Sequence, residues 1–530
     1  MNIDKEHFYT YEALVDWIDG VKEAYSQYVS VRSLVKTPQG RDVFMLTVTR
    51  PGKPESLKPG YVIFANVHAC ELAGTTQSLC VIKTLLEEYR DTLLQDIVFY
   101  IVPRMNPDGA EQAMTHKMDI RSRIEFKKRL NGLIPKDLDG DGKILSMRLK
   151  HPDGNMIEHP KDRRIMIQKS EEYPNETTYY VYDEGLIHDF TDISSVRSCV
   201  EQTDFNRNWP VNWLLTPLSG KYPFSEVEIK AMGDFLLNHP NVFAGIDFHC
   251  GSKAIFKPSS LLNHEIDPDD QKQIDAVAKT ASDMTGEIVM LSGYREEGSP
   301  PLPGFGGTSQ DFTYFMCGLS FFVFELGNGF SDIGMTTPQI LKVFGKGQNE
   351  LMKEHGPQIL ELNDTKGRSF YHEWKEFNHP QLGAIEIGGL ETPRCNSYYM
   401  YPPISWDLYQ KNTQFVLKHA GFRPVLCITS ITERTNEDHV LISCTIANTG
   451  FFNTNIMRKT RKSAMNPVIV SIRDKEHNRI SYQEVEDIKG GEEITLDFAV
   501  NKDTVRDQYR IKAYHPRAGE VEEKRTFVNT

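Results

Sequence analysis

The chain has 530 residues, which is more than one hydrophobic core usually supports, so we expect two or more domains. Its apolar fraction of 39% and charged fraction of 25% are typical of globular proteins that fold in water. The formal net charge of −13 disfavours nucleic acids and anionic membranes as partners, and no apolar stretch is long enough to span a bilayer. We therefore expect neither a nucleic-acid partner nor a membrane partner.

The first residues, Met-Asn-Ile-Asp-Lys-Glu-His, lack the apolar segment of a secretory signal, and the eight cysteines are too dispersed for a disulfide framework. Cys70 and Cys250 each stand beside a candidate metal ligand, but their spacing does not match a structural zinc knuckle. We interpret them as reduced packing residues and expect a cytoplasmic protein. The oligomeric state is not indicated by any pattern in the sequence.

The predicted elements begin with a helix over residues 8–27, where apolar side chains recur at helical spacing. A hairpin follows, with strands over residues 29–35 and 43–48 on either side of a turn that contains proline and glycine. A further apolar run predicts a strand over residues 97–102, and a loop is expected over residues 104–109.

Residues 61–71, Tyr-Val-Ile-Phe-Ala-Asn-Val-His-Ala-Cys-Glu, form an apolar run that predicts a buried strand and ends in His68 and Glu71. Apolar residues then recur at helical spacing over residues 72–90, so the pair lies on a strand-to-helix corner. In open α/β sheets such corners at the carboxyl ends of strands are where ligands bind. An imidazole and a carboxylate suit Zn²⁺, which needs a third protein ligand and an open position for catalysis.

Two later apolar runs also deliver polar side chains. Residues 242–249 end in His249, and residues 319–326 contain Glu325 within an otherwise apolar run. A carboxylate on a buried strand is costly unless it is paired, lies near a metal, or acts as a base with a raised pKa. An ion pair with a purely structural role is the alternative interpretation for Glu325.

Two polar segments complete an ordered set of motifs. Residues 106–109 read Asn-Pro-Asp-Gly, and residues 203–210 read Thr-Asp-Phe-Asn-Arg-Asn-Trp-Pro, a loop that combines an acid, an amide and a guanidinium. Together with His-x-x-Glu, Asp-Phe-His and Phe-Glu-Leu they occur in the order that is typical of one family. The sequence resembles the zinc metallocarboxypeptidases of the carboxypeptidase A superfamily over residues 1 to about 345.

The resemblance implies a zinc-dependent metallopeptidase that hydrolyses a C-terminal peptide or amide bond through a metal-activated water. His68, Glu71 and His249 match the ligands of one Zn²⁺ ion, and Glu325 matches the catalytic base. In the family an arginine that polarises the scissile carbonyl lies fifteen positions after the asparagine of Asn-Pro-Asp-Gly, which points here to Arg121.

An insertion begins near Arg121, so Arg123 and Arg148 remain alternatives for this role. The other roles implied by the resemblance concern the substrate, which is a peptide or an N-acyl amino acid with a free carboxylate. The corresponding residues are Asn206 and Arg207 for the carboxylate and Gln310 for the side chain of the terminal residue. Asp204 has a different role: it matches a residue that hydrogen-bonds a ligand histidine, here His68.

The sequence also departs from the family pattern. Cys70 stands where an arginine often precedes the metal-binding glutamate, and Pro303 stands at the position of a mobile active-site tyrosine, for which Tyr294 or Tyr314 could substitute. These losses keep two alternatives open. One is an amidase or deacylase of the same superfamily that acts on N-acyl amino acids or cell-wall peptides, and the other is a non-catalytic pseudo-peptidase that serves as a binding module.

The insertion covers about residues 120–200 and is rich in charged and turn residues. Within it, residues 137–142 read Asp-Leu-Asp-Gly-Asp-Gly, which has the acidic spacing and the glycine of a calcium loop. The twelfth position is Arg148, where such a loop needs a bidentate glutamate. We therefore favour an acidic turn without a metal over a calcium site.

We expect a catalytic domain over residues 1–365, a connector over residues 366–423 that contains one helix, and an accessory domain over residues 424–530. Helices that alternate with apolar strands predict an α/β catalytic domain, built on a mixed, mostly parallel sheet with helices on both faces. The last region contains short strand-like segments separated by turns, which predicts a C-terminal β-sandwich. The predicted segments are residues 426–431, 440–446, 468–472, 494–500 and 509–514.

Overall fold

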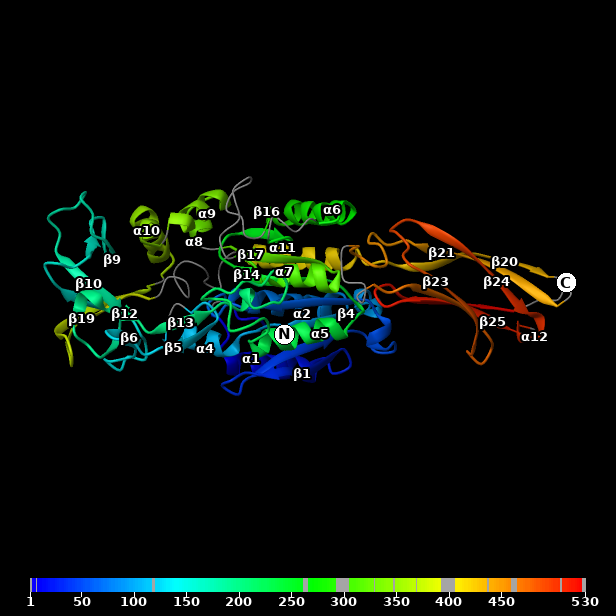
Figure 1. Ribbon diagram of the computed structural model, residues 1–530, viewed down its shortest axis with the longest axis horizontal. Coiled ribbons are helices and arrows are strands. Elements are labelled where there is room, and N and C mark those ends of the chain that lie inside the picture. Colours follow the sequence, from blue (N-terminus) through cyan, green and yellow to red (C-terminus); the bar gives the residue numbers. More distant parts are fainter. Residues whose placement is uncertain are drawn as a thin grey trace.

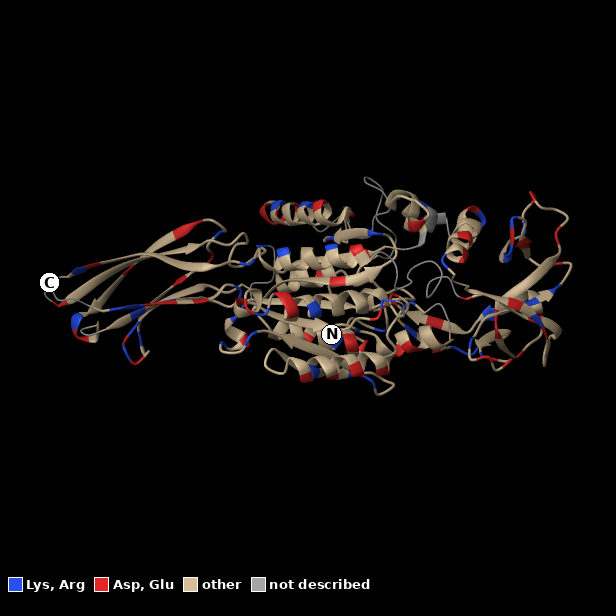
Figure 2. Ribbon diagram, turned by 180° about the vertical axis from the view of Figure 1, so that it is seen from behind, with Lys and Arg blue, Asp and Glu red and all other residues tan. Residues whose placement is uncertain are grey.

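The computed structural model describes residues 2–5, 7–116, 120–260, 266–291, 305–327, 329–346, 348–367, 369–391, 406–435, 438–458, 465–505 and 508–526. The described chain is elongated and has three parts in a row (Figure 1). A central α/β part lies between a β-sheet built mainly from the insertion at one end and two C-terminal sheets at the other. Lys and Arg residues are interspersed with Asp and Glu residues along all three parts (Figure 2).

The central sheet has eight strands in the order β1-β2-β4-β3-β14-β17-β15-β16. Strands β4, β3, β14 and β17 run parallel, β1 and β2 add at one edge in antiparallel fashion, and β15 pairs antiparallel with β17. The prediction of a mixed, mostly parallel sheet is therefore confirmed. The strands are β1 (Val29–Lys36), β2 (Asp42–Val48), β3 (Gly60–Ala65), β4 (Val98–Val102), β14 (Val242–Cys250), β15 (Ala254–Lys257), β16 (Ile288–Leu291) and β17 (Ser320–Leu326).

Helices cover both faces of this sheet, because its inner strands are apolar on both sides. On β3, Tyr61 and Ile63 pack into the core on one face, whereas Val62 and Phe64 pack into the core on the other. The first face carries α1 (Tyr11–Ala24), α2 (Ala73–Glu88), α6 (Pro268–Thr285) and α11 (Trp406–Ala420), and the second carries α5 (Val227–Asn238). The predicted layering of helices on both faces is confirmed.

Two helices begin elsewhere than the sequence predicted. The expected loop over residues 104–109 ends early, because α4 (Pro107–His116) starts at the proline of Asn-Pro-Asp-Gly. Helix α6 begins at Pro268, whereas the sequence pattern over residues 274–284 predicts a helix that starts only at residue 274. Asp267 caps it by accepting hydrogen bonds from the backbone N–H groups of the first turn, and a proline with fixed φ suits that first turn.

The insertion forms short strands that the sequence did not predict. Four of them join β18 and β19 in a six-stranded sheet of order β18-β19-β7-β10-β8-β9, so part of the expected connector completes this sheet. Helix α10 (Gln348–Thr365) packs against β9. The strands are β5 (Arg123–Phe126), β6 (Gly132–Pro135), β7 (Ser146–Lys150), β8 (Met156–His159), β9 (Asp162–Gln168), β10 (Thr178–Asp183), β11 (Gly185–His188), β12 (Arg197–Ser198), β13 (Val200–Thr203), β18 (Tyr371–His379) and β19 (Gly383–Leu390).

The C-terminal part is a β-sandwich, as predicted. A sheet of order β20-β21-β24 faces a sheet of order β23-β22-β25-β26, and apolar residues from both sheets share one core. The edge strands β23 and β26 were not predicted, because charged and polar residues dominate them, as is common at sheet edges. The strands are β20 (Leu426–Thr435), β21 (His439–Asn448), β22 (Val468–Arg473), β23 (Arg479–Val485), β24 (Glu493–Asn501), β25 (Tyr509–His515) and β26 (Gly519–Arg525).

Arg517 fastens the sandwich to the central part. Its buried guanidinium donates to the carbonyl of Gly318 at 3.0 Å, just before β17, and to the carbonyl of Asn455 at 2.9 Å. Across the described ranges, no helix has the length and apolar character that crossing a bilayer requires. The remaining elements are η1 (Glu55–Leu57), α3 (Leu93–Asp96), η2 (Ile193–Ser195), η3 (Phe205–Arg207), α7 (Ser309–Phe312), η4 (Thr313–Cys317), α8 (Gly329–Asp332), α9 (Thr337–Lys346) and α12 (Lys502–Val505).

Candidate metal centre

The corner between β3 and α2 presents His68 and Glu71 at the carboxyl end of the central strands. Asn66 makes the turn possible, because it adopts a left-handed backbone with φ of 55°, which asparagine tolerates better than most residues. Its side-chain amide donates to the carbonyl of His68 at 2.7 Å and so fixes the loop. Both candidate ligands are almost completely buried there.

His249 reaches the same point from the end of β14, which pairs directly with β3. Nδ1 of His68 lies 2.8 Å from one carboxylate oxygen of Glu71, and Nδ1 of His249 lies 3.0 Å from the other. The two Nδ1 atoms are 3.0 Å apart. Three side chains from two distant parts of the chain thus converge on a single point.

The chemistry of these donors fits zinc. Two imidazole nitrogens and one carboxylate are typical zinc ligands, and the three donor atoms lie within 4.8 Å of one another. Tetrahedral bonds of about 2.0–2.1 Å would place neighbouring ligand atoms about 3.3 Å apart, slightly more than the separations of 2.8–3.0 Å seen here. Three protein ligands also leave one position open, which is the pattern of a catalytic site.

A carboxylate backs each ligand histidine on the side away from the centre. Nε2 of His68 lies 3.0 Å from Oδ1 of Asp204, and Nε2 of His249 lies 2.9 Å from Oδ2 of Asp247. Such partners fix the ring orientation and the tautomer of metal-binding histidines. The sequence reasoning placed Asp204 here but assigned no role to Asp247. The signal was present, because residues two apart on a strand point to the same face.

The stem of the insertion brings Arg121 to the centre. Strands β5 and β13 pair with Thr203 opposite Arg123, so the chain segments that carry Arg121 and Asp204 leave the stem together. Nε of Arg121 donates to Asp204 at 2.9 Å, and its Nη1 donates to the ligand Glu71 at 3.0 Å.

The two alternative arginines are engaged elsewhere. Arg123 forms ion pairs with Glu226 and Glu228, and Arg148 pairs with Glu158 and Glu386 in the sheet of the insertion.

Opposite charges compensate each other within this buried cluster. Burial alone raises the pKa of Glu71, but His68 and His249 outweigh it and hold the pKa well below its usual value. Burial likewise raises the pKa of Asp204, and Arg121 and His68 reverse the effect. Both carboxylates are therefore ionised and available as a ligand and as a hydrogen-bond acceptor.

Glu325 lies beside the ligands on β17. In the parallel pairing of β14 with β17 it stands opposite His249, and it is the one residue of β17 that keeps part of its surface exposed. Burial and the negative charge of Glu71 raise its pKa to about 7, against the opposing effects of His249 and Arg121. A carboxyl group with such a pKa can exchange protons near neutral pH.

Asn206 and Arg207 follow Asp204 in the short helix η3. Oδ1 of Asn206 accepts a hydrogen bond from the backbone N–H of Ser309 at 2.8 Å. The Arg207 guanidinium lies over the ring of Phe305, 3.8 Å from its centroid, and is partly exposed. Gly307 lets its segment pass close to the backbone of Arg207. Its φ is +64°, and a Cβ atom at this position would lie only 2.5 Å from the carbonyl oxygen of Arg207.

Gln310 is buried in α7 and directly follows Ser309. The Oε1 atom of Gln310 lies 3.4 Å from the Oγ atom of Ser309. Tyr314, one of the two expected substitutes for a mobile tyrosine, is committed to the core, where its hydroxyl donates to Asp270 at 2.8 Å. Pro303 and the other candidate, Tyr294, lie outside the described residues.

The acidic loop of the insertion forms a second cluster of possible metal ligands, in which Asp137, Asp139 and Glu184 have carboxylate oxygens within 4.8 Å of one another. These oxygens already accept backbone hydrogen bonds. Asp137 accepts from Gly140 at 2.6 Å and from Gly142 at 2.9 Å, and Glu184 accepts from Asp139 at 3.2 Å. The contacts account for the loop as a turn that is held together by its own acids.

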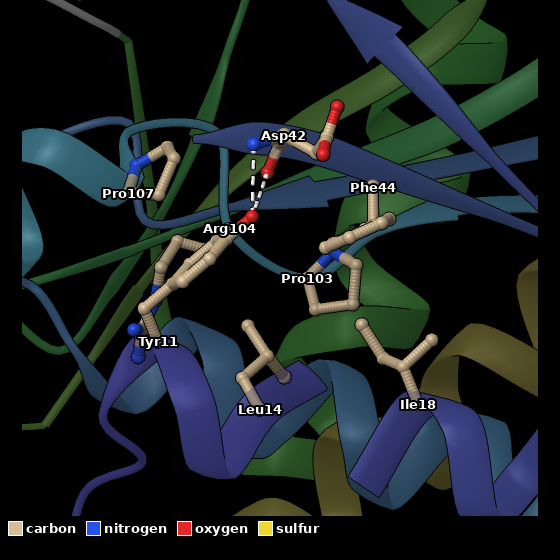
Figure 3. Close-up of a pocket in the computed structure, with 8 residues that line it drawn as sticks. All are labelled: Tyr11, Leu14, Ile18, Asp42, Phe44, Pro103, Arg104 and Pro107. Carbon is tan, nitrogen blue, oxygen red and sulfur yellow. Dashed lines mark hydrogen bonds between the residues drawn. The ribbon is translucent and has the colours of Figure 1, made fainter. Parts of the chain in front are cut away.

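A small hollow on the α1 side of the sheet is formed by other elements. Its eight lining residues include Leu14 and Ile18 of α1 and Phe44 of β2, and none of the predicted site residues is among them (Figure 3). Arg104 also lines it but uses its guanidinium to donate to the carbonyl of Tyr9 at 2.7 Å. We assign this hollow a packing role.

Comparisons with known proteins agree with this geometry. Chicken (Gallus gallus) carboxypeptidase Z is 31% identical over 112 residues, which cover 20% of this chain and 17% of that protein. Pig (Sus scrofa) carboxypeptidase A1 is 22% identical over 283 residues, or 52% of this chain and 51% of that protein. Carboxypeptidase B of Astacus astacus is 22% identical over 293 residues, or 53% and 73%. The chain thus spans about half or less of the first two of these relatives.

Among solved structures, bovine thrombin-activatable fibrinolysis inhibitor in complex with tick carboxypeptidase inhibitor is 21% identical, with 61% of this chain and 87% of that chain covered and a TM-score of 0.39. Carboxypeptidase A from Helicoverpa armigera is 15% identical, with 61% and 66% covered and a TM-score of 0.41.

Two family models match. A model described as a domain of unknown function covers residues 427–526, which form most of the sandwich. The model described as zinc carboxypeptidase covers residues 14–341, which is more than half of the chain. Zinc is also the metal that suits the His-Glu-His cluster. The chain belongs to the zinc carboxypeptidase family.

Proposed function

We propose that the protein is a zinc-dependent carboxypeptidase that hydrolyses the peptide or amide bond next to a free C-terminal carboxylate. One observation carries the proposal. The His68, Glu71 and His249 cluster is bordered by a partly exposed carboxyl group, Glu325, whose pKa of about 7 suits a base, and by the partly exposed cation Arg121. Ligands, base and cation are the three parts that metal-assisted amide hydrolysis requires.

In this proposal His68, Glu71 and His249 would hold zinc through Nδ1, a carboxylate oxygen and Nδ1. When bound there, zinc polarises a carbonyl group and lowers the pKa of water to about 7. Asp204 and Asp247 keep the two imidazole rings turned toward the centre. The protein supplies a dry and preorganised pocket around the reacting atoms.

Glu325 acts as the general base and then as the general acid. Its ionised form takes a proton from the attacking water and passes it to the nitrogen of the leaving amine. A pKa near 7 leaves a large fraction ionised at neutral pH and still allows proton donation in the second step. The partial exposure of Glu325 gives it access to both water and substrate.

Arg121 stabilises the negative charge that develops on the carbonyl oxygen. Electrostatic help of this kind is typically worth about 3–4 kcal/mol. Arg207 and Asn206 bind the terminal carboxylate of the substrate, for which a planar guanidinium is well shaped. The packing of Arg207 against Phe305 orients the guanidinium for that task. Gln310 contacts the side chain of the terminal residue.

The test compares peptides that have a free C-terminus with the same peptides after C-terminal amidation, using the zinc-loaded full chain. We expect hydrolysis of the free peptides only. Arg207→Ala should lower kcat/KM for them about 10- to 100-fold, the equivalent of losing a hydrogen bond to a charged group. Equal turnover of amidated peptides would contradict the carboxypeptidase assignment.

The same assay separates the alternatives that the sequence leaves open. Hydrolysis of N-acyl amino acids with no release of residues from peptides would identify an amidase or deacylase. A protein that neither binds zinc nor hydrolyses any of these substrates would be a binding module.

A further inference from the structure

The two ligand histidines are supported by different means. The carboxylate behind His68, Asp204, is paired with Arg121 at 2.9 Å. The carboxylate behind His249, Asp247, is fully buried, and among the described residues no Lys or Arg forms an ion pair with it. The Oδ1 atom of Asp247 has no hydrogen-bond partner among the residues that the structure describes. The ion-pair partner of Asp247 is the histidine itself, so among the described residues Asp247 has no permanent cation beside it, which is costly for a buried carboxylate.

We propose that Asp247 is a positioning residue for the metal, and that Ser309 links it to the segment that binds the substrate carboxylate. Only the part of this inference that concerns the substrate carboxylate rests on the proposed function. In this proposal a zinc ion held by His249 would provide the positive charge that compensates the negative charge of Asp247. Asp247 therefore contributes to metal affinity as well as to geometry.

The geometry around His249 supports the first half of the proposal. Nε2 faces Asp247 at 2.9 Å, and Nδ1 faces Glu71 at 3.0 Å, so both ring nitrogens are assigned. A carboxylate at Nε2 favours the tautomer that carries its proton there, which leaves the lone pair of Nδ1 free for a metal. Burial of both groups prevents water from replacing this contact.

Ser309 supports the second half. Its Oγ donates to Oδ2 of Asp247 at 2.8 Å, the same oxygen that faces His249. Its backbone N–H donates to Oδ1 of Asn206 at 2.8 Å. A single residue at the start of α7 thus contacts both the support of the metal ligand and the loop that carries Arg207. Ser309 and Asn206 are both buried, so the connection is shielded from solvent.

The first experiment measures the zinc affinity of the full chain by competition with a chromophoric chelator, in the absence of substrate. Asp247→Ala should weaken zinc binding about 10- to 100-fold, the usual effect of removing the partner of a ligand histidine. Asp247→Asn should lie between this variant and the wild type, because an amide oxygen can still accept from Nε2 but carries no charge. Unchanged affinity in both variants would overturn the proposal.

A control separates positioning from general stability. Asp108 is also a buried carboxylate, bonded to Thr37 at 2.8 Å and to Arg41 at 2.9 Å, and it lies outside the metal cluster. Asp108→Asn should lower the melting temperature but leave zinc affinity unchanged. If it weakened zinc binding as much as Asp247→Asn, the effect at Asp247 would be one of folding, and the proposal would be wrong.

A second readout reports on the ligand geometry itself. With cobalt in place of zinc, the visible absorption of Asp247→Asn should differ from that of the wild type, because His249 is less firmly oriented. The Asp108→Asn spectrum should match the wild type. If Asp247→Ala does not fold, the affinity and the spectrum of Asp247→Asn decide, and wild-type values for both would refute the role of Asp247.

Ser309→Ala tests the link. It removes the hydroxyl that contacts Asp247 but keeps the backbone contact to Asn206. We expect a loss of zinc affinity smaller than that of Asp247→Asn and a higher KM for peptides with a free carboxylate. Wild-type values for both quantities would refute the link and leave Asp247 untouched. Zinc affinity is measured without substrate, so a failure of the proposed peptidase activity would show separately, as a zinc-loaded wild type without turnover.

Discussion

Two clusters of possible metal ligands can be compared in this molecule. At the central sheet, His68, Glu71 and His249 turn two nitrogen lone pairs and a carboxylate toward one another. In the insertion, the carboxylate oxygens of Asp137 and Glu184 accept hydrogen bonds from backbone N–H groups of the acidic loop. Among the described residues, the two Nδ1 atoms of the first cluster contact only other members of that cluster, whereas the acids of the second already accept backbone hydrogen bonds. Closely spaced ligand atoms therefore indicate a metal site only where some of them lack other hydrogen-bond partners.

The sharpest way to break this comparison is to remove one ligand of the central cluster. His249→Ala should abolish zinc binding and lower turnover by more than the roughly 10⁴-fold that a general base alone supplies, because the metal is lost with its chemistry. Metal analysis and peptide hydrolysis measure both effects. His239→Ala is the matched control, since His239 bonds the carbonyl of Phe235 at 2.7 Å and should be dispensable for zinc. Retained turnover in His249→Ala would mean that the centre lies elsewhere.

Glu325→Gln separates the metal from the base. It should reduce turnover about 10²- to 10⁴-fold while zinc content stays at that of the wild type, because the amide cannot accept a proton. In the wild type, kcat/KM should rise with pH through about 7 as Glu325 ionises in the free enzyme. A Glu325→Gln variant with normal turnover would show that Glu325 is not the base and that another group takes the proton.

Glu287 sharpens the comparison, because it is a buried carboxyl group with neither a metal nor a backbone donor: both of its oxygens lack hydrogen-bond partners among the described residues. Burial, together with the charge of Glu325, raises its pKa from 4.5 to about 8, against the effect of Lys253. A folded-state pKa above the unfolded value means that stability falls as the pH rises from 4.5 to 8.

Glu287→Gln should remove this pH dependence. At pH 8 the variant should be more stable than the wild type by an amount on the order of a few kcal/mol, and near pH 4 the two should be alike. Urea unfolding at both pH values measures the difference. Equal stabilities at pH 8 would show that Glu287 is ionised and compensated in the folded protein.

The smallest effects are expected in the insertion. Adding millimolar calcium should shift the melting temperature by less than about 1 °C, because the carboxylates of the acidic loop already accept backbone hydrogen bonds. Asp137→Ala should lower the free energy of unfolding by about 1–2 kcal/mol through the loss of its two backbone contacts, with zinc content and turnover unchanged. A clear stabilisation by calcium that Asp137→Ala abolishes would make the two clusters alike.

The central sheet could be predicted from the sequence because its inner strands are buried on both faces. Such strands read as unbroken apolar runs, and the side chains that end those runs, His68 and His249, stand out. Their convergence needed the ordered motifs as well, because periodicity alone does not say which strands are neighbours.

The insertion and the edges of the sandwich could not be predicted in the same way. Strands such as β5 and β12 have four and two residues and are largely exposed, so neither length nor apolar pattern marks them. Asp247 was overlooked for the opposite reason. It stands inside an apolar run, where the sequence shows one acidic letter but not the buried ring nitrogen beside it.

The β5–β13 stem has a consequence for how the fold is maintained. Arg121 and Asp204 are 83 positions apart in the chain, and closing a loop of that length costs conformational entropy that grows with the logarithm of its size. The backbone hydrogen bonds of the ladder between the two strands offset part of this cost next to the site. The outlying sheet could therefore change in length or surface during evolution without disturbing the contact between Arg121 and Asp204, provided that the two strands at its root continued to pair.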